Sequence, residues 1–272
     1  MTSTTGSTPK STDAVRRAAV FLHGKRDLVA TAYDRLREVA RRSDVELVEG
    51  DELPDLAVVL GGDGTMIRAL RRYLGTDVPV LGVNFGRVGF LTSIMADDLE
   101  HGLARAFAGD YAVADLPTLD ARVDGASHVA VNDLVVHAST LGRMVELGWE
   151  VGGEDYGALA CDGVVCSAPS GSTAYNLSNG GPVLAWGLDA MAITFIAPHS
   201  LRVRPLVIGR NAEAVIRNRT PDVQATVLVD GHAAAEIGPG PEVHVRLGEQ
   251  RTRLAMLPDS VFFRRYRETF AS

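Results

Sequence analysis

The chain has 272 residues, 46% of them hydrophobic and 22% charged, with a formal net charge of −7 and a pI near 5.5. This composition suffices for one large domain or two ordinary ones, and the acidic balance argues against a nucleic-acid or anionic-membrane partner, since both select for clustered lysine and arginine. No apolar run reaches the ~20 residues of a membrane span, and two cysteines are too few for a disulfide scaffold, so a reducing, cytoplasmic setting is predicted.

The first part of the chain alternates short apolar runs with amphipathic segments. After a serine- and threonine-rich segment at residues 1–13, predicted to be a flexible tail, apolar runs predict strands at 18–22, 45–48, 56–60 and 78–83. Apolar residues at helical spacing predict helices at 26–42, 66–74 and 97–108. Strands that alternate with helices indicate a parallel sheet, so residues 14–115 are predicted to form a Rossmann-like α/β domain.

From residue 116 the chain changes to short β-rich runs separated by glycine, asparagine, aspartate and proline. These runs lie at 119–123, 129–136, 144–151, 163–167, 192–196, 214–216, 225–229 and 242–247. They predict an all-β, sandwich-like domain over residues 116–255. Aromatic residues then alternate with arginines up to Phe270, so residues 256–272 are predicted to contain a helix that docks back on the N-terminal domain.

The first candidate site is Gly61-Gly62-Asp63-Gly64-Thr65, between the strand at 56–60 and a helix. Glycines let the backbone approach a ligand closely, and N–H groups at a helix start can bind phosphate. A carboxylate among phosphates is repelled unless it binds Mg²⁺ or takes a proton from an attacking hydroxyl, and both roles are open to Asp63. The alternative is a tight turn without a ligand. The sequence contains neither a Walker-type motif nor GxGxxG.

Two further stretches have the chemistry of a binding site. Residues 84–91 (NFGRVGFL) follow the fourth strand, and after Asp162-Gly163 the loop at residues 168–182 contains many glycines, amides and small hydroxylated residues. Such a loop offers many hydrogen-bond donors, and Tyr175 can stack on a flat ring. A flexible linker is a poor alternative because apolar pairs flank the loop, and a serine nucleophile is disfavoured because G-x-S-x-G is absent.

Together these motifs resemble the NAD kinase family. The strand–GGDGT–helix unit is shared with diacylglycerol and sphingosine kinases and, more distantly, with phosphofructokinases. Residues 168–182 resemble the more specific TPTGSTAY…GGP signature of NAD kinases. Residues 84–91, 198–206 and 230–232 resemble the family's NxGxxGFL, PHxLxxRP and DGQ elements, in the family order.

The resemblance implies a reaction and a role for each matching residue. Asp63 is implied to be the general base that takes the proton from the adenosine-ribose 2′-hydroxyl of NAD, which ATP or polyphosphate then phosphorylates to give NADP. Asn132 and Asp133 are implied to hold adenine and ribose, and Asp162 to bind the nicotinamide end in a neighbouring subunit's site. The implied nucleotide and dinucleotide contacts are Gly61, Gly62, Gly64, Thr65, Arg68, Asn84, Phe90, Asn132, Asp133, Asp162, Ser170, Thr173, Ala174, Tyr175, Asn176, Ser178, Ala197 and His232. No protein-held metal is implied, because Mg²⁺ enters through the ATP phosphates.

Several positions depart from the family pattern. Asp133 stands for the family's glutamate, Ala160 for an arginine or histidine, Ala168 for a threonine and His232 for a glutamine. These changes lie where the dinucleotide is recognised, so one alternative is a catalytically altered dinucleotide-binding paralogue. The other, which the shared GGDGT motif leaves open, is a lipid kinase of the same superfamily. The acidic composition and the intact Asp63 favour the NAD kinase. The resemblance further implies a homodimer or homotetramer that binds NAD and ATP, and the acidic charge balance predicts that neither nucleic acid nor a membrane is a partner.

Overall fold

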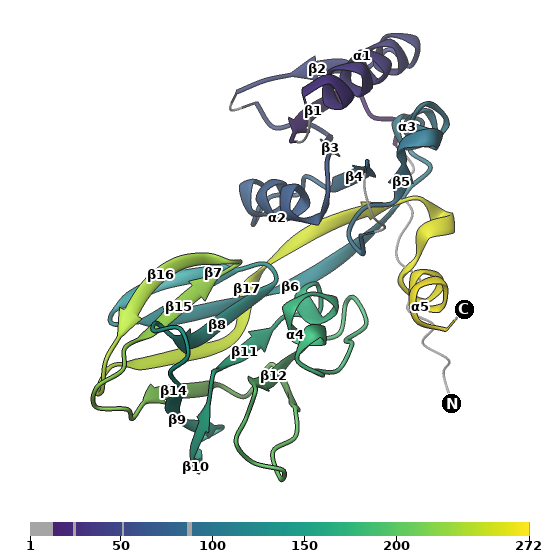
Figure 1. The fold of residues 1–272 in the computed structure, drawn as a ribbon. Helices are drawn as coiled ribbons and strands as arrows, with labels where there is room; N and C mark the ends of the chain where they lie inside the picture. Colours follow the sequence, from purple (N-terminus) through teal and green to yellow (C-terminus); the bar gives the residue numbers. More distant parts are fainter. Residues whose placement is uncertain (1–12, 24–25, 51, 86–88, 272) are drawn as a thin grey trace. The chain divides into compact units, whose positions relative to one another are not determined.

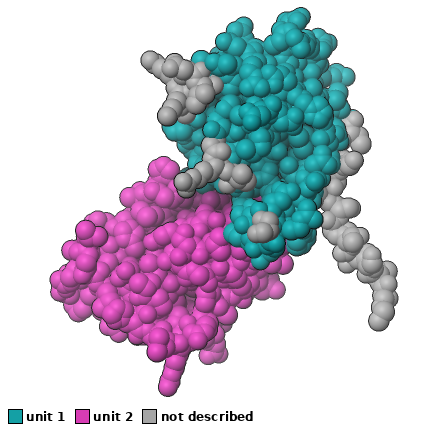
Figure 2. Space-filling view, turned by 45° about the vertical axis from the view of Figure 1, so that its right-hand side comes forward, with its two compact units in different colours: residues 1–115, 252–272 teal, residues 116–251 magenta. Residues whose placement is uncertain are grey.

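The computed structural model describes residues 13–23, 26–50, 52–85 and 89–271 (Figure 1). The predicted tail up to residue 12, and Gly86, Arg87 and Val88 of the second motif, lie outside the described residues. The chain divides into two compact units (Figure 2): Met1–Asp115 with Thr252–Ser272, here called unit 1, and Leu116–Arg251, called unit 2. Within the described residues, no helix has both the length and the apolar character that crossing a membrane requires.

Unit 1 is built on a parallel sheet with the strand order β2-β1-β3-β4. Its strands are β1 (Arg17–Leu22), β2 (Glu46–Val48), β3 (Leu56–Leu60), β4 (Val80–Asn84) and β5 (Ile94–Met95). The end of β17 (Glu242–Met256) also pairs with β4 in parallel, through Leu254 and Ala255. Every residue of β3 is buried, as expected of a strand that is covered on both faces.

The helices of unit 1 cover both faces of this sheet. They are α1 (Arg26–Arg42), α2 (Asp63–Arg72), α3 (Leu99–Phe107) and α5 (Phe262–Phe270). Helices α1 and α3 lie side by side on one face, where Leu36 and Leu103 pack with Val58. Helix α2 lies on the other face, so close to β4 that a Cβ on Gly82 would lie 2.6 Å from the sulfur of Met66. Successive β3 side chains alternate between these two faces.

Unit 2 consists of two antiparallel sheets that share one core. One sheet has the order β13-β12-β11-β8-β15-β16, and the other contains β10-β9-β14-β17 together with β6 and β7. Inward-facing residues of both sheets, among them Val136, Leu147, Phe195 and Val243, pack in this core. The remaining strands and the one-turn helix are β6 (Ala112–Val123), β7 (Ala126–Ala130), β8 (Asp133–Ala138), β9 (Val145–Val151), β10 (Glu154–Cys161), β11 (Gly163–Ser167), α4 (Tyr175–Ser178), β12 (Ala190–Ile196), β13 (Leu206–Gly209), β14 (Ala214–Asn218), β15 (Ala225–Val229) and β16 (His232–Ile237).

The structure confirms the predicted α/β part, the β-rich part and the C-terminal helix, with local corrections. The helix that was predicted to start at Met66 begins at Asp63, because Gly62 adopts an extended conformation at its N-cap and lets the helix begin inside the motif. The single run at 129–136 is two strands, β7 and β8, interrupted at Val131 and Asn132. Strands β5, β10, β13 and β16 were not predicted. In β10, Gly157 with a φ of 81° interrupts the apolar pattern, and in β16 three alanines weaken it.

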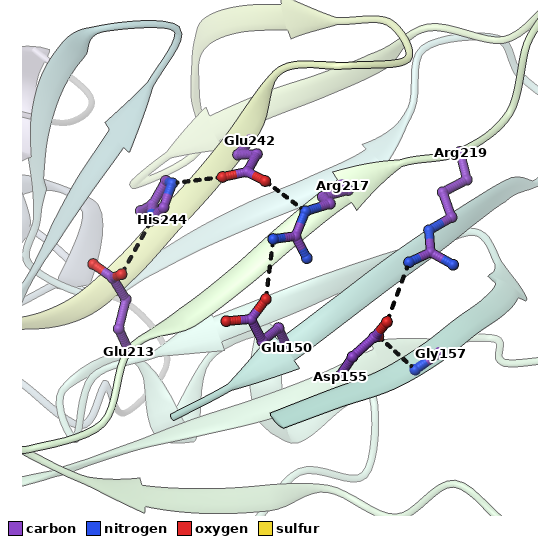
Figure 3. A network of polar contacts seen from close by, with 8 residues as sticks. All are labelled: Glu150, Asp155, Gly157, Glu213, Arg217, Arg219, Glu242 and His244. Atoms are coloured by element: carbon purple, nitrogen blue, oxygen red, sulfur yellow. Dashed lines mark hydrogen bonds and ion pairs between the residues drawn. The ribbon is translucent and has the colours of Figure 1, made fainter. Parts of the chain in front are cut away.

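One side of unit 2 carries a ladder of charges across neighbouring strands (Figure 3). His244 lies between Glu213 and Glu242, with a ring nitrogen 3.0 Å from a carboxylate oxygen of each. Arg217 lies 2.6 Å from Glu242 and 3.0 Å from Glu150. Partly exposed ion pairs contribute little singly, so this ladder supports the pairing of β9, β14 and β17 without dominating their stability.

Candidate functional site

The GGDGT motif forms the junction between β3 and α2. Gly61 follows the last residue of β3, and its N–H donates to the carbonyl of Val83 on β4 at 3.0 Å. A side chain at Gly61 has no room, because a Cβ there would lie 2.9 Å from Thr65 Oγ1. Gly62 is the N-cap of α2, and Asp63 is its first residue. A helix that starts after a buried parallel strand presents backbone N–H groups and the positive end of its dipole to an anion.

The carboxylate of Asp63 is held by the segment that follows the second motif. It accepts the backbone N–H of Phe90 at 3.0 Å and that of Leu91 at 3.3 Å. Gly89 packs directly against it, since a Cβ on Gly89 would overlap the carboxylate. Burial raises the pKa of the Asp63 carboxyl, while the two N–H donors and Arg265 act in the opposite direction. A raised pKa brings a carboxylate closer to the range in which it accepts a proton well.

The other predicted residues of unit 1 surround the same strand ends. Because β3 and β4 are parallel, their carboxyl ends place Gly61 and the buried Asn84 at one edge of the sheet. Thr65 is buried in the first turn of α2, and Arg68 is exposed nearby, with Nη2 3.5 Å from Thr65 Oγ1. Phe90 is buried, and its ring stacks on Phe270 of α5 with ring centroids 5.6 Å apart.

In unit 2 the segment before β8 is held by hydrogen bonds to its N–H groups and its carbonyls. The carboxylate of Asp230 accepts three backbone N–H groups, from Val131 at 2.9 Å, Asn132 at 2.7 Å and Asp133 at 3.3 Å. Ser170 Oγ donates to the carbonyl of Val131 at 2.5 Å. These contacts explain why the β-rich run breaks here: the N–H groups of Val131 and Asn132 and the Val131 carbonyl bond to side chains, while the Asn132 carbonyl accepts the backbone N–H of Ala168 at 2.8 Å.

Asn132 and Asp133 bring different chemistry to this fixed segment. The Oδ1 atom of Asn132 is buried and has no hydrogen-bond partner among the described residues. Such an acceptor is costly unless something donates to it, so it fits a ligand that carries an N–H or O–H group. Asp133 is 7% exposed, and burial together with the nearby Asp230 carboxylate raises its pKa to about 7. The segment therefore offers an amide acceptor beside a carboxyl that titrates near neutrality.

The serine- and glycine-rich loop is an ordered structure rather than a linker. The buried amide of Asn176 donates to the carbonyls of Ser172 and Pro182 at 3.1 and 3.0 Å and accepts from Thr194 Oγ1 at 2.7 Å. Gly181 fits against it so tightly that a Cβ there would overlap the amide oxygen. Asn176 therefore holds the loop together, and its side chain is engaged within unit 2.

The remaining predicted residues of unit 2 are mostly exposed at strand ends and turns. Asp162 lies between β10 and β11, and its N–H donates to the Ile196 carbonyl at 3.0 Å, next to Ala197, which has a φ of 44°. Tyr175 is 45% exposed at the start of α4, and His232 is exposed at the start of β16. The loop also contains the half-buried Thr173 and the exposed Ala174 and Ser178.

Three residues of this architecture are missing from the set predicted from the sequence. Asp230 precedes a glycine, so the sequence predicts only a turn there and gives no sign of its contacts with Val131–Asp133. Gly89 lies within the second motif, but its contact with Asp63 depends on folding. Arg265 is one of several arginines in the terminal helix, and it differs from the others only in its partners: Nη1 donates to the carbonyls of Gly89 and Phe90 at 2.9 and 3.0 Å.

Known proteins match the chain over nearly its whole length. The model of the ATP-NAD kinase N-terminal domain matches residues 16–111, and that of the ATP-NAD kinase C-terminal domain matches residues 131–257. An NAD kinase of Heliobacterium modesticaldum is 37% identical over 265 residues, which cover 96% of this chain and 94% of the relative. An NAD kinase of Geobacter metallireducens is 39% identical over 227 residues, 82% of this chain and 80% of the relative. The chain belongs to the NAD kinase family.

Solved structures agree with this assignment. The crystal structure of an NAD kinase from Archaeoglobus fulgidus in complex with ATP has a TM-score of 0.77 at 25% identity, covering 94% of this chain and 97% of that one. Yeast NADH kinase complexed with NADH has a TM-score of 0.80 at 20% identity, with 95% and 88% covered, and supports the fold alone. The prediction of an NAD kinase, a phosphotransferase with an alcohol acceptor, is thus confirmed over the lipid kinase and the altered paralogue.

Proposed function

We propose that this chain transfers the γ-phosphoryl group of ATP to the adenosine-ribose 2′-hydroxyl of NAD, and that Asp63 is the general base. The position of the Asp63 carboxyl carries the proposal. It is the acid of the GGDGT motif, it stands at the start of α2, and burial raises its pKa. A carboxylate with these properties suits the removal of a hydroxyl proton at a phosphate-binding helix end.

The proposed reaction balances as an in-line displacement. The 2′-hydroxyl gives its proton to Asp63 while its oxygen forms a bond to the γ-phosphorus, and the bond from that phosphorus to the β-bridging oxygen breaks to release ADP. Backbone N–H groups at the start of α2 and the exposed guanidinium of Arg68 are suited to bind the phosphates. Most of the acceleration then comes from positioning and from stabilisation of charge.

Magnesium fits this site as a companion of the nucleotide. Among the described residues, no group of three or more His, Cys, Asp and Glu side chains is arranged to hold a metal ion. In such sites most ligands of Mg²⁺ are water molecules and substrate phosphate oxygens, so the protein does not need to supply a complete set of ligands. When bound on the triphosphate, the ion would neutralise its charge.

Unit 2 supplies the proposed recognition of the dinucleotide. The buried Oδ1 of Asn132 is suited to accept from the adenine amino group, and the Asp133 carboxylate to accept from a ribose hydroxyl. The exposed ring of Tyr175 offers a stacking surface, with Asp162, Ala197 and His232 as further proposed contacts. The shorter Asp133 side chain, compared with the family's glutamate, requires a closer approach of the ribose or a bridging water.

A cytoplasmic location and a homodimeric or homotetrameric state complete the proposal. Cys161 and Cys166 are free and buried, and burial raises the pKa of each thiol to about 12, so neither is activated for disulfide exchange. Reduced, unreactive thiols of this kind suit a reducing compartment. Light scattering of the purified chain measures the assembly directly.

One assay tests the proposed reaction. The purified chain is incubated with ATP, Mg²⁺ and NAD, and NADP is measured; parallel reactions replace NAD with NADH or diacylglycerol, and ATP with polyphosphate. Formation of NADP is expected to exceed phosphorylation of the lipid by orders of magnitude. A chain that phosphorylates the lipid but not NAD or NADH contradicts the proposal.

A further inference from the structure

We infer that Arg265, on the C-terminal helix, is a positioning residue for the proposed base: it holds the peptide groups of Gly89 and Phe90, whose neighbouring N–H groups hold the carboxylate of Asp63. The inference rests on the proposed function and deepens it. Through Arg265, helix α5 contributes to the proposed phosphoryl-transfer site, although no residue of α5 belongs to a nucleotide-binding motif.

The backbone of residues 89–91 forms hydrogen bonds with Asp63 and with Arg265. On one side, the N–H groups of Phe90 and Leu91 donate to Asp63 at 3.0 and 3.3 Å. On the other, Arg265 Nη1 donates to the carbonyls of Gly89 and Phe90 at 2.9 and 3.0 Å. Two peptide groups thus connect the guanidinium to the carboxylate: the Gly89 carbonyl shares one with the Phe90 N–H, and the Phe90 carbonyl shares the next with the Leu91 N–H. Hydrogen bonds in such a chain polarise and strengthen one another.

Packing of the C-terminal segment fixes where the guanidinium lies. The ring of Phe90 lies between two rings of α5, with centroids 5.6 Å from Phe270 and 6.1 Å from Phe262. Just before the helix, Ser260 Oγ donates to the carbonyl of Ser93 at 3.2 Å, and Arg265 Nε donates to the carbonyl of Ser260 at 3.1 Å. The planar fork of Arg265 therefore ties the start of α5 and the Gly89–Phe90 segment together, which a lysine ammonium reproduces poorly.

Charge gives Arg265 a second effect on the base. Among the described residues, Arg265 is the charged group that acts on Asp63, and Asp63 and Glu268 are those that act on Arg265. Burial lowers the pKa of Arg265 to about 10, so the guanidinium stays protonated throughout the neutral range. Its positive charge favours the ionised form of Asp63, which is the form that accepts a proton.

The test compares Arg265 with a neighbour that lacks these contacts. Arg264 lies on the same helix and is exposed, and in the described part of the chain it forms ion pairs with Asp259 at 3.8 Å and Glu268 at 3.3 Å. Full-length R265M, R265K and R264M are compared in NADP formation, first at saturating ATP and NAD and then across pH 5 to 9. Melting temperatures establish that each variant is folded.

The expected pattern separates geometry from charge. R265M loses about 10- to 100-fold in kcat with KM values within about threefold, as expected when a base is displaced by a fraction of an ångström to one ångström. Its acid limb of kcat moves to higher pH, because the charge that favoured ionised Asp63 is gone. R265K keeps the wild-type acid limb but not the full kcat, and R264M matches the wild type. Added guanidinium ion at millimolar concentration is expected to restore part of the R265M activity.

Two results would overturn the inference while the proposed function stands: an active wild type with R265M equal to R264M, or a loss in R265M whose acid limb stays unmoved. A wild type that forms no NADP sinks the proposed function instead. If R265M does not fold, G89A replaces it, because its Cβ would push Asp63 away and lower kcat. Its matched control is G209A, where a Cβ meets no atom closer than 3.9 Å. Equal kcat in these two variants also contradicts the inference.

Discussion

Each unit contains a carboxyl that the proposed reaction needs, Asp63 half-buried in unit 1 and Asp133 buried in unit 2, but the groups next to these two carboxyls have opposite effects. In unit 1 the Asp63 carboxylate lies on two backbone N–H groups, and the Arg265 guanidinium acts on it. In unit 2 the Asp133 carboxyl lies beside a second carboxylate, Asp230, whose oxygens are engaged by backbone N–H groups. Burial raises both pKa values, and the neighbours then oppose that rise in one case and add to it in the other.

This difference matches the two tasks that the proposal gives these carboxyls. A general base must be ionised before the reaction yet able to take a proton, so a raised pKa that is held in check by donors suits Asp63. A recognition group needs only to reach its ligand in a fixed place, so Asp133 tolerates a carboxylate neighbour because that neighbour anchors its backbone. Burial alone therefore says little about what a carboxyl does; its neighbours decide.

The largest effect is expected from removing the base itself. Asp63→Asn keeps the shape and one acceptor oxygen but cannot take up a proton, so kcat should fall about 10²- to 10⁴-fold. The KM for NAD should change little, because recognition is assigned to unit 2. Steady-state NADP formation measures both constants, and Asp98→Asn, at an exposed acid, is the control. Near-normal turnover in Asp63→Asn would exclude it as the base.

A smaller and different effect is expected in unit 2 from Asp230→Asn. Asparagine tolerates the left-handed φ of 49° at this position, so the backbone is not strained. One acceptor oxygen is lost from the three N–H contacts, and the KM for NAD should rise about tenfold while kcat stays within about threefold. Loss of the neighbouring charge also lowers the pKa of Asp133 from about 7.

The pH dependence of KM makes this prediction specific. If ionised Asp133 accepts a ribose hydroxyl, KM in the wild type should rise as pH falls through about 7, and in Asp230→Asn that rise should move to lower pH. Asp222→Asn, which removes an exposed acid of unit 2 paired with Arg143, is the control. If the KM for NAD rises tenfold but its pH profile does not move, Asp230 acts only by anchoring the backbone. That result would contradict an effect of its charge on the pKa of Asp133.

Asp133→Asn should make the protein more stable while weakening NAD binding. The folded-state pKa of about 7 lies above the ordinary unfolded value, so the native state binds more protons in between and loses stability as pH rises through that window. Removing the acid should therefore add on the order of 2–4 kcal/mol to the unfolding free energy at pH 8 and almost nothing at pH 4. Urea unfolding at the two pH values measures the difference, and an equal gain at both would rule out the electrostatic cause.

How far the sequence could predict these sites depends on whether the interactions are local. The position of Asp63 follows from a buried strand and a glycine-rich turn, both readable within about ten residues. Its contacts with Phe90 and Leu91 are 27 and 28 residues away, and those of Arg265 with Gly89 and Phe90 are 176 and 175. No residue pattern indicates such pairings, because the sheet and the returning C-terminal segment create them.

The same reasoning applies to the strands and to Asp230. The break at Val131 and Asn132 lies inside an apolar run, so periodicity predicts one strand, whereas hydrogen bonds to the distant Asp230 and Ser170 side chains explain the interruption. Asp230 itself precedes glycine in a short turn, where aspartate is common for conformational reasons alone. Its contacts across 97 to 99 residues are what place it next to the candidate recognition residues Asn132 and Asp133.

The smallest effect is expected where carboxylates are paired at the surface, which completes the comparison with the two buried ones. Arg217 holds Glu242 and Glu150 (Figure 3), and its hydrogen bond lowers the pKa of Glu242, the reverse of the shift at Asp133. Because solvent screens these charges, Arg217→Met should lower the melting temperature by no more than about 3 °C, and by less in high salt. Both KM values and the pH profile should match the wild type. A shifted pH profile in Arg217→Met would mean that distant charges also affect the pKa values of Asp63 and Asp133. The difference between their neighbours, Arg265 and Asp230, would then not be enough to explain those pKa values.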